Sequence, residues 1–199
     1  MTINKQDITA VILAGGQGSR LGGQDKGLVT YKNKRLIEHI LTAIEPQVNS
    51  VLISANRNTD IYKAYGYPVI KDNLTNYQGP LAGLSAAMTI ATTNYIISMP
   101  CDGPLLSGDL VSRLILSLRQ QSARKLRSIA VAHDGQRLQP VTALIPVKLL
   151  HSLNSFLASG ERKTALWYAK HDYICCDFSD IANTFANINT EQQRRAMED

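Results

Sequence analysis

The segment Ala10-Val11-Ile12-Leu13-Ala14-Gly15-Gly16-Gln17-Gly18-Ser19-Arg20-Leu21-Gly22-Gly23-Gln24-Asp25-Lys26 decides how this chain folds. Its first five residues form a short apolar run, which predicts a buried strand. Five glycines among the next nine residues let the backbone approach a ligand closely and point N–H groups at phosphate oxygens. Arg20 and Lys26 add a planar guanidinium and a point charge, both suited to a polyphosphate. The segment therefore predicts a nucleoside triphosphate site at the end of a strand.

Two common phosphate-binding motifs do not fit this loop. A P-loop requires Ser or Thr directly after its lysine, whereas Lys26 is followed by Gly27. A dinucleotide-binding fingerprint that starts at Gly16 requires a third glycine where Leu21 stands. An ordinary flexible loop is the alternative, but two cations at this spacing after a strand disfavour it.

The composition is that of a soluble globular protein. The length of 199 residues suits a single domain, which we expect over residues 1–199. Because the chain has no run of about 18 apolar residues and no signal-peptide core, we expect no membrane partner and a cytoplasmic location. The net charge of +5 suits a small anionic substrate as well as nucleic acid. We interpret the basic run at 124–127 as a solvated loop and expect no nucleic acid partner.

The cysteines indicate a reducing compartment. There are three of them, Cys101, Cys175 and Cys176, and no C-x-x-C motif. An odd number without this motif argues for free thiols rather than a disulfide framework or a zinc site. Cys101 lacks a recognisable partner motif, so we do not expect it to act as a nucleophile.

Apolar runs and helical periodicities alternate along the chain. We expect strands at 10–14, 29–31, 51–54, 68–71, 95–99, 128–133, 141–145 and 173–178. We expect helices at 36–44, 60–65, 81–91, 109–121 and 147–158, and a last one from Thr190 with a capping box to Gln193. This alternation predicts an α/β fold with a doubly wound, mainly parallel sheet. Ligands bind beyond the carboxyl ends of such strands, so the glycine-rich loop and Asp102 should meet at one edge.

Asp102 is the strongest single candidate for chemistry. It follows a predicted strand and lies between Pro100 and Pro104, which stiffen the turn. Mg²⁺ prefers one or two carboxylates together with phosphate oxygens and water, so Asp102 is the expected metal ligand. Capping of the following turn is the alternative. Arg20 and Lys26 would then hold the triphosphate and neutralise charge during phosphoryl transfer.

Several motifs together carry a family resemblance. They are Leu13-Ala14-Gly15-Gly16 with Arg20, Gly22-Gly23 and Asp25-Lys26-Gly27, followed by Gly79-Pro80-Leu81-Ala82-Gly83, Pro100-Cys101-Asp102-Gly103-Pro104, His133-Asp134-Gly135, Gly160-Glu161-Arg162 and Asn187-Ile188-Asn189-Thr190. This set, from about residue 10 to about residue 195, resembles the molybdenum cofactor guanylyltransferases. The resemblance implies a Rossmann-like nucleotidyltransferase that uses Mg²⁺ to transfer GMP from GTP to the terminal phosphate of Mo-molybdopterin, releasing pyrophosphate. It also implies proteins that deliver or receive the molybdenum cofactor.

The same resemblance implies a set of contacts. Asp102 would bind the metal and the nucleotide, and Asn187 and Asn189 would hold the pterin or the metal, although a plain strand-to-helix turn fits them equally well. Arg137, Gln139 and Pro140 would line the acceptor side. The remaining nucleotide contacts would be Leu13, Ala14, Gly15, Gly16, Lys26, Ser54, Asp72, Gly79 and Pro80. Ser54 stands where many relatives carry Asn.

Alternatives to this function come from the same superfamily and from outside it. A cytidylyltransferase for the same pterin and a sugar-phosphate nucleotidyltransferase are the related ones, and a non-catalytic nucleotide-binding module is the third. The sequence Leu-Ala-Gly-Gly, where cytidylyl relatives tend to have Leu-Ala-Ala-Gly, favours guanine. Retention of Arg20, Lys26 and Asp102 together argues against a binding module.

Overall fold

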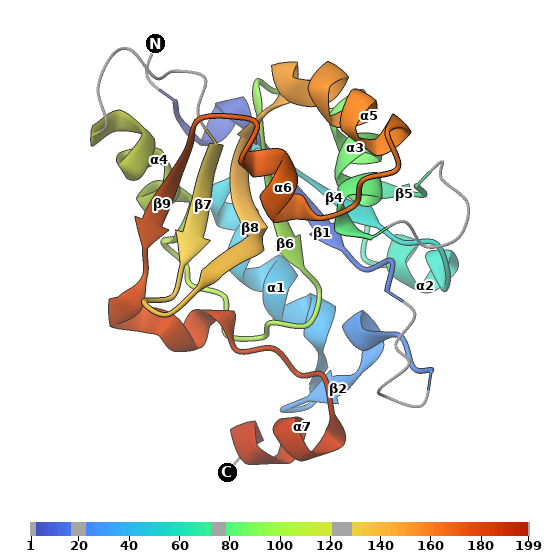
Figure 1. Cartoon of the computed structure of the whole chain (residues 1–199). Helices are drawn as coiled ribbons and strands as arrows, with labels where there is room; N and C mark the ends of the chain where they lie inside the picture. The colour runs from blue at the N-terminus through green and yellow to red at the C-terminus, as the bar shows by residue number, and fades with distance from the viewer. Residues whose placement is uncertain (1–2, 17–22, 73–78, 121–128, 199) are drawn as a thin grey trace.

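The computed structural model describes residues 3–16, 23–72, 79–120 and 129–198. Within these residues, seven strands form one sheet in the order β5-β4-β1-β6-β8-β7-β9 (Figure 1). The strands are β1 (Ile8–Leu13), β4 (Ser50–Ser54), β5 (Val69–Ile70), β6 (Tyr95–Pro100), β7 (Ile129–His133), β8 (Leu138–Pro146) and β9 (Tyr173–Asp177). A small hairpin of β2 (Thr30–Tyr31) and β3 (Lys34–Arg35) lies apart from this sheet.

The sheet is mainly parallel, as the sequence predicts. β1 pairs in parallel with both β4 and β6, β4 pairs with β5, and β7 pairs with β9. β8 runs antiparallel to β6 and β7. Its direction follows from the turn at 134–137, because strands joined by so short a connection can only be antiparallel. Gly135 adopts a φ of 93° in this turn, a conformation that favours glycine.

Helices cover both faces of the sheet. α1 (Leu36–Ile44) and α4 (Leu110–Gln120) pack on one face, and α3 (Pro80–Ile90), α5 (Leu150–Ala158) and α6 (Thr164–Tyr168) pack on the other (Figure 1). α2 (Thr59–Lys63) lies near β5, and α7 (Glu191–Glu198) lies beside the β2–β3 hairpin. Within the described residues, no helix is both long enough and apolar enough to cross a membrane.

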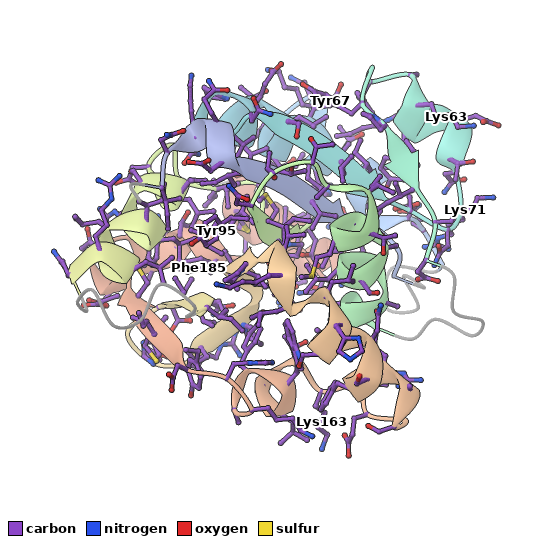
Figure 2. All side chains as sticks on the ribbon, turned by 90° about the horizontal axis from the view of Figure 1, so that it is seen from above. Lys63, Tyr67, Lys71, Tyr95, Lys163 and Phe185 are labelled. Atoms are coloured by element: carbon purple, nitrogen blue, oxygen red, sulfur yellow. The ribbon has the colours of Figure 1, made fainter. Side chains whose placement is uncertain are left out.

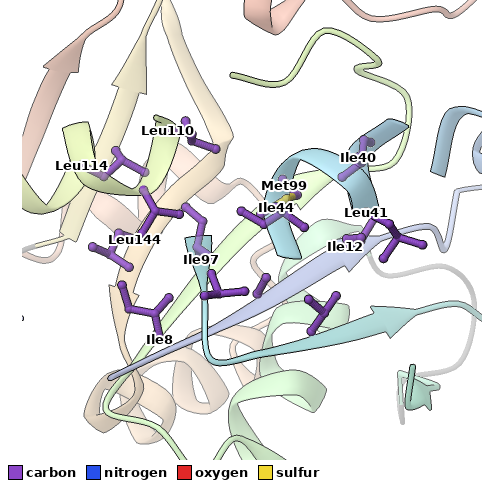
Figure 3. Close-up of a cluster of buried hydrophobic side chains, with 14 of the residues drawn as sticks. Ile8, Ile12, Ile40, Leu41, Ile44, Ile97, Met99, Leu110, Leu114 and Leu144 are labelled. Carbon is purple, nitrogen blue, oxygen red and sulfur yellow. The ribbon is translucent and has the colours of Figure 1, made fainter. Parts of the chain in front are cut away.

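The central strands are fixed by the core beneath α1 and α4. Figure 3 shows side chains of β1, β6, α1 and α4 meeting in one cluster, among them Ile8, Ile12, Ile40, Ile44, Ile97, Met99, Leu110 and Leu114. Each is essentially excluded from solvent. Full burial of one such side chain contributes about 1.5–3 kcal/mol, so this cluster holds β1 and β6 rigidly side by side. These are the strands that lead into the glycine-rich loop and Asp102.

The outer surface carries exposed lysines as well as exposed apolar side chains such as Ile90 and Leu116. Lys63, Lys71 and Lys163 lie at the periphery when the molecule is seen from above, whereas Tyr95 lies at the level of the sheet (Figure 2). Such a mixed surface is ordinary for a globular domain.

The predicted elements exist, with differences at their ends. The helix expected at 147–158 begins with a 3₁₀ turn, Val147–Leu149, before α5 starts. α6 and the 3₁₀ segment Ser179–Phe185 were not predicted, because short helices show too few periods of the apolar pattern. At the last helix, Gln193 N–H donates to Thr190 Oγ1 at 3.1 Å as expected, but the Gln193 side chain accepts from Asn189 N–H at 2.8 Å and not from Thr190.

Candidate active site

The carboxyl ends of β1 and β6 form the centre of the candidate site. Leu13 lies in register with Pro100, so the glycine-rich loop and Asp102 leave the sheet at the same edge. Ala14, which is buried, donates its N–H to the carbonyl oxygen of Ser54 at 2.8 Å and so joins the ends of β1 and β4. The prediction that the start of this loop, Gly15 and Gly16, and Asp102 lie at one edge is therefore confirmed, and residues 17–22 of the loop lie outside the described residues.

A cleft of about 500 Å³, here called the larger cleft, opens at this edge. Its lining includes seven of the predicted nucleotide contacts: Leu13, Gly15, Gly16, Ser54, Asp72, Gly79 and Pro80. Gly83, Pro100 and Val141 also line it. The sequence motifs thus come together from β1, β4, the segment after β5, and the start of α3.

A second cleft of about 260 Å³, the smaller cleft, adjoins the first. It is lined by Lys26, Asp102, Asn187 and Asn189, and also by Gln139 and Pro140 of β8. Pro100 and Val141 line both clefts, so the two meet at these residues. Asp102 lies two residues beyond this shared wall. Two ligands bound side by side would therefore approach each other beside Asp102 and Lys26.

Lys26 and Asp102 are in direct contact. Lys26 Nζ lies 3.0 Å from Asp102 Oδ2, and it also donates a hydrogen bond to Asn189 Oδ1. The Asp102 side chain is only 9% exposed. Ile188 N–H donates to the backbone carbonyl of Asp102 at 2.9 Å, which anchors the 187–189 segment beside it. Of the predicted charged residues, the structure brings these two together, while Arg20 lies outside the described residues.

Asp102 Oδ1 has the character of a cation ligand. Among the described residues it is buried and accepts no hydrogen bond. Burying an oxygen that has no hydrogen-bond partner costs about 1–3 kcal/mol of folding free energy. A cation bound to that oxygen would offset this cost. The described part of the chain contains no group of three or more His, Cys, Asp and Glu placed to share a metal. A single carboxylate fits Mg²⁺ where phosphate and water supply most of the other ligands.

Asp72 is held at the rim of the larger cleft by Asn56. The Asn56 amide donates to Asp72 Oδ2 at 2.7 Å, and Asp72 N–H donates back to Asn56 Oδ1 at 3.1 Å. This reciprocal pair fixes the direction of the carboxylate. Asn56 is therefore a neighbour that orients a predicted contact, although it does not line the cleft itself.

Known proteins were compared with this chain. Residues 10–173 match the family described as the MobA-like NTP transferase domain. A molybdenum cofactor guanylyltransferase from Shewanella halifaxensis (strain HAW-EB4) is 47% identical over 190 residues, which cover 96% of this chain and 93% of the relative. The chain belongs to the molybdenum cofactor guanylyltransferase family. It is accordingly a nucleotidyltransferase.

Other guanylyltransferase relatives agree with this assignment. The family member from Shewanella loihica (strain ATCC BAA-1088 / PV-4) is 46% identical, with 96% of this chain and 95% of the relative covered. The crystal structure of molybdopterin-guanine dinucleotide biosynthesis protein A from Archaeoglobus fulgidus superposes with a TM-score of 0.75, covering 96% of each chain. At 19% identity, this last likeness shows a shared fold.

Two further residues near the clefts are Arg137 and Cys101. Arg137, expected on the acceptor side, has an 80% exposed side chain that lies 3.8 Å from Asp134 and is absent from the described lining of the smaller cleft. It sits in the exposed turn between β7 and β8, so its contact with the acceptor stays a prediction. Burial raises the pKa of the Cys101 thiol well above its usual range, with the nearby Asp102 charge adding to this. A thiol that stays protonated agrees with the expectation that Cys101 is no nucleophile.

Gly83 lines the larger cleft. The sequence pointed to it as part of the motif Gly79-Pro80-Leu81-Ala82-Gly83, but not as a contact. A Cβ atom at this position would lie 2.5 Å from Ser54 Oγ and 2.9 Å from Leu13 Cδ2. The missing side chain lets α3 approach the ends of β1 and β4 closely. The available signal was a glycine inside a helical pattern, which points to close packing.

We expect Gly83→Ala to destabilise the protein and to weaken GTP binding several-fold. In an open helix this change stabilises by up to about 1 kcal/mol, but overpacking of a tight contact costs about 1–3 kcal/mol, so the sign reverses. Thermal unfolding and GTP calorimetry measure both effects. Gly108→Ala is the control, because a Cβ there meets no atom within 4 Å. Equal behaviour of the two variants would contradict the packing role of Gly83.

Proposed function

We propose that this chain transfers GMP from GTP to the terminal phosphate of molybdenum-bound molybdopterin, forming the guanine dinucleotide cofactor and pyrophosphate. The observation that supports this most directly is the pair of adjoining clefts, which meet at Pro100 and Val141 beside Asp102. A transferase for two substrates needs such an arrangement, because both must be held within reach of one reacting phosphorus.

The larger cleft is the proposed GTP site. Backbone groups of Leu13, Ala14 and Gly15 would contact the base and ribose. Gly16, next in the chain, would lie nearer the phosphates. Gly79 and Pro80 form a rigid edge, because Pro80 starts α3 and Gly79 holds a φ of 80°. Ser54 is a shorter hydrogen-bonding group than the asparagine found in many relatives. Asp72, oriented by Asn56, is the proposed carboxylate contact.

The smaller cleft is the proposed acceptor site. Its polar lining includes side-chain amides, those of Gln139, Asn187 and Asn189. An amide offers both donors and an acceptor, as a pterin ring edge requires. Gln139 is itself oriented, since its amide nitrogen donates to Asp134 Oδ2 at 2.6 Å.

The proposed reaction is a direct displacement. An oxygen of the acceptor's terminal phosphate attacks the α-phosphorus of GTP, forming a new P–O bond. The bond from the α-phosphorus to the bridging oxygen breaks, and pyrophosphate leaves with that electron pair. No covalent enzyme intermediate is needed, because the attacking phosphate is already anionic. The obstacle is repulsion between anions, which positioned cations offset.

Lys26 is placed to supply one of these cations. Its ammonium has three N–H donors, of which Asp102 and Asn189 take two. The third N–H donor can face a phosphate oxygen where the smaller cleft, which Lys26 lines, meets the larger one. Arg20 is the second proposed cation, on the sequence argument alone. A Mg²⁺ ion, when bound, would add Lewis-acid stabilisation of the phosphate charge. Asp102 would hold that ion through the oxygen that has no other partner among the described residues.

We expect GTP to be preferred over ATP and CTP by about 10²-fold or more in kcat/KM, because a polar base site rejects bases that leave its groups unpaired. Pyrophosphate release, measured with each of the four nucleotides with and without Mo-molybdopterin, tests this. Preference for CTP would indicate the cytidylyltransferase alternative. Binding of GTP without any turnover would indicate a binding module. Equal GTP and CTP affinities in calorimetry would contradict guanine selection.

We further propose that residues 1–199 act as one nucleotidyltransferase domain in the cytoplasm and exchange the cofactor with proteins that deliver or receive it. All three cysteines are free thiols, which supports a reducing compartment. Limited proteolysis of the folded chain tests the domain assignment, because a two-domain protein would yield two stable fragments.

A further inference from the structure

Asp25, the residue before Lys26, is a buried carboxylate with partners on both oxygens. Tyr62 Oη donates to Oδ1 at 2.6 Å, and Asn58 Nδ2 donates to Oδ2 at 3.0 Å. The Asp25 side chain is only 3% exposed and lines neither described cleft. Burial raises the pKa of Tyr62, so its hydroxyl stays protonated and remains a donor. Both carboxylate oxygens of Asp25 are thus engaged by the α2 region, beside a third cleft of about 520 Å³ that Asp25 and Asn58 line.

Arg57 holds the backbone just before Asp25. Its two terminal nitrogens donate to the carbonyl oxygens of Gly23 and Gln24, at 2.9 Å and 3.1 Å. Its Nε, which is buried without a hydrogen bond among the described residues, lies 3.8 Å from Asp25 Oδ2. Asn58, next in the chain, adopts a left-handed φ of 52°, a conformation that Asn tolerates better than most residues. The turn therefore aims consecutive side chains at the 23–25 segment.

The residue after Lys26 is fixed by the same tyrosine. A Cβ atom on Gly27 would lie 2.6 Å from Tyr62 Oη, so the backbone here lies directly against the hydroxyl. Leu28 N–H donates to the Asp25 carbonyl at 3.0 Å, which closes a tight turn around Lys26. Tyr62, itself fully buried, contacts the chain on both sides of Lys26.

We propose that Asp25 and Tyr62 are positioning residues that hold Lys26 for phosphoryl transfer. This inference rests on the proposed function. The 57–62 segment fixes the backbone of Lys26, and Asp102 and Asn189 fix its ammonium. A displacement of about 1 Å of a positioned group can cost a large factor in rate, so the network matters for chemistry as well as for folding.

A double-mutant cycle tests this proposal. Tyr62→Phe removes one hydroxyl and keeps the ring that fills the core. We expect it to lower the single-turnover rate of GMP transfer about tenfold when Lys26 is present. In the Lys26→Ala background we expect a further loss of at most about twofold, because the group that Tyr62 positions is gone. Asp25→Asn, combined with Lys26→Ala in the same way, repeats the cycle from the other side of the hydrogen bond.

The control is Tyr65→Phe, which removes a hydroxyl that accepts from Arg35 at 3.3 Å, outside both clefts. Its rate should stay within about twofold of the parent enzyme, and thermal unfolding should show each variant folded. Equal losses with and without Lys26, or no loss in either cycle, would overturn the positioning role. Unfolding of both Tyr62→Phe and Asp25→Asn would also overturn it, by assigning the network to stability. A parent enzyme that transfers no GMP would instead refute the proposed function.

Discussion

Asp102→Asn is expected to reduce Mg²⁺-dependent GMP transfer by about 10³-fold or more while the protein stays folded. The substitution keeps the shape of the side chain and removes its charge. Asp102 Oδ1 is the buried oxygen without a partner among the described residues, and an amide in its place binds a divalent cation poorly. The backbone carbonyl of residue 102 still accepts from Ile188, so the local fold keeps its anchor.

Single-turnover rates over a range of Mg²⁺ concentrations measure this effect, with thermal unfolding as the check on folding. Asp60→Asn is a matched control, because it also removes one carboxylate from a lysine pair, at 3.1 Å from Lys63, but on a 94% exposed side chain. The control should keep the activity of the parent enzyme. Activity of Asp102→Asn within a few-fold of the parent would remove the metal-ligand assignment.

The fold was predictable because its signals are local. The apolar runs of β1 and β6 and the amphipathic α1 can each be recognised within a window of about a dozen residues. Parallel strands have their carboxyl ends at one edge, so the prediction that the start of the glycine-rich loop and Asp102 share an edge followed from strand direction alone. α6, with five residues, was too short to leave such a pattern.

The finer architecture of the site was not predictable, because its contacts join distant residues. The hydrogen bond from Tyr62 to Asp25 joins residues 37 positions apart in the sequence, and the hydrogen bond from Lys26 to Asn189 joins residues 163 positions apart. Nothing in a single sequence says which buried tyrosine faces which carboxylate. Family resemblance predicted many of the residues that line the two clefts, whereas the acceptor-side role of Arg137, whose side chain is 80% exposed, stays a prediction.

Lys26→Ala is expected to slow the chemical step by about 10²-fold or more, and to weaken GTP binding much less. The charge is most useful where the phosphate bonds form and break, and backbone donors and base contacts remain to bind the nucleotide. Single-turnover kinetics and equilibrium GTP binding on the same variant separate the two effects. Lys63→Ala, which removes a 61% exposed lysine paired with Asp60, should change neither.

The Mg²⁺ dependence of the Lys26→Ala variant distinguishes two possible roles of Lys26, direct charge stabilisation and support of the metal ligand. The Lys26 ammonium lies 3.0 Å from Asp102 Oδ2. Its removal leaves that carboxylate without its paired charge, so the Mg²⁺ concentration needed for half-maximal rate should stay the same or fall, even as the rate itself drops. A higher Mg²⁺ requirement would mean that Lys26 acts by supporting the metal ligand. Unchanged chemistry with weakened GTP binding would leave Lys26 as a docking residue for the triphosphate, with no part in the transfer step.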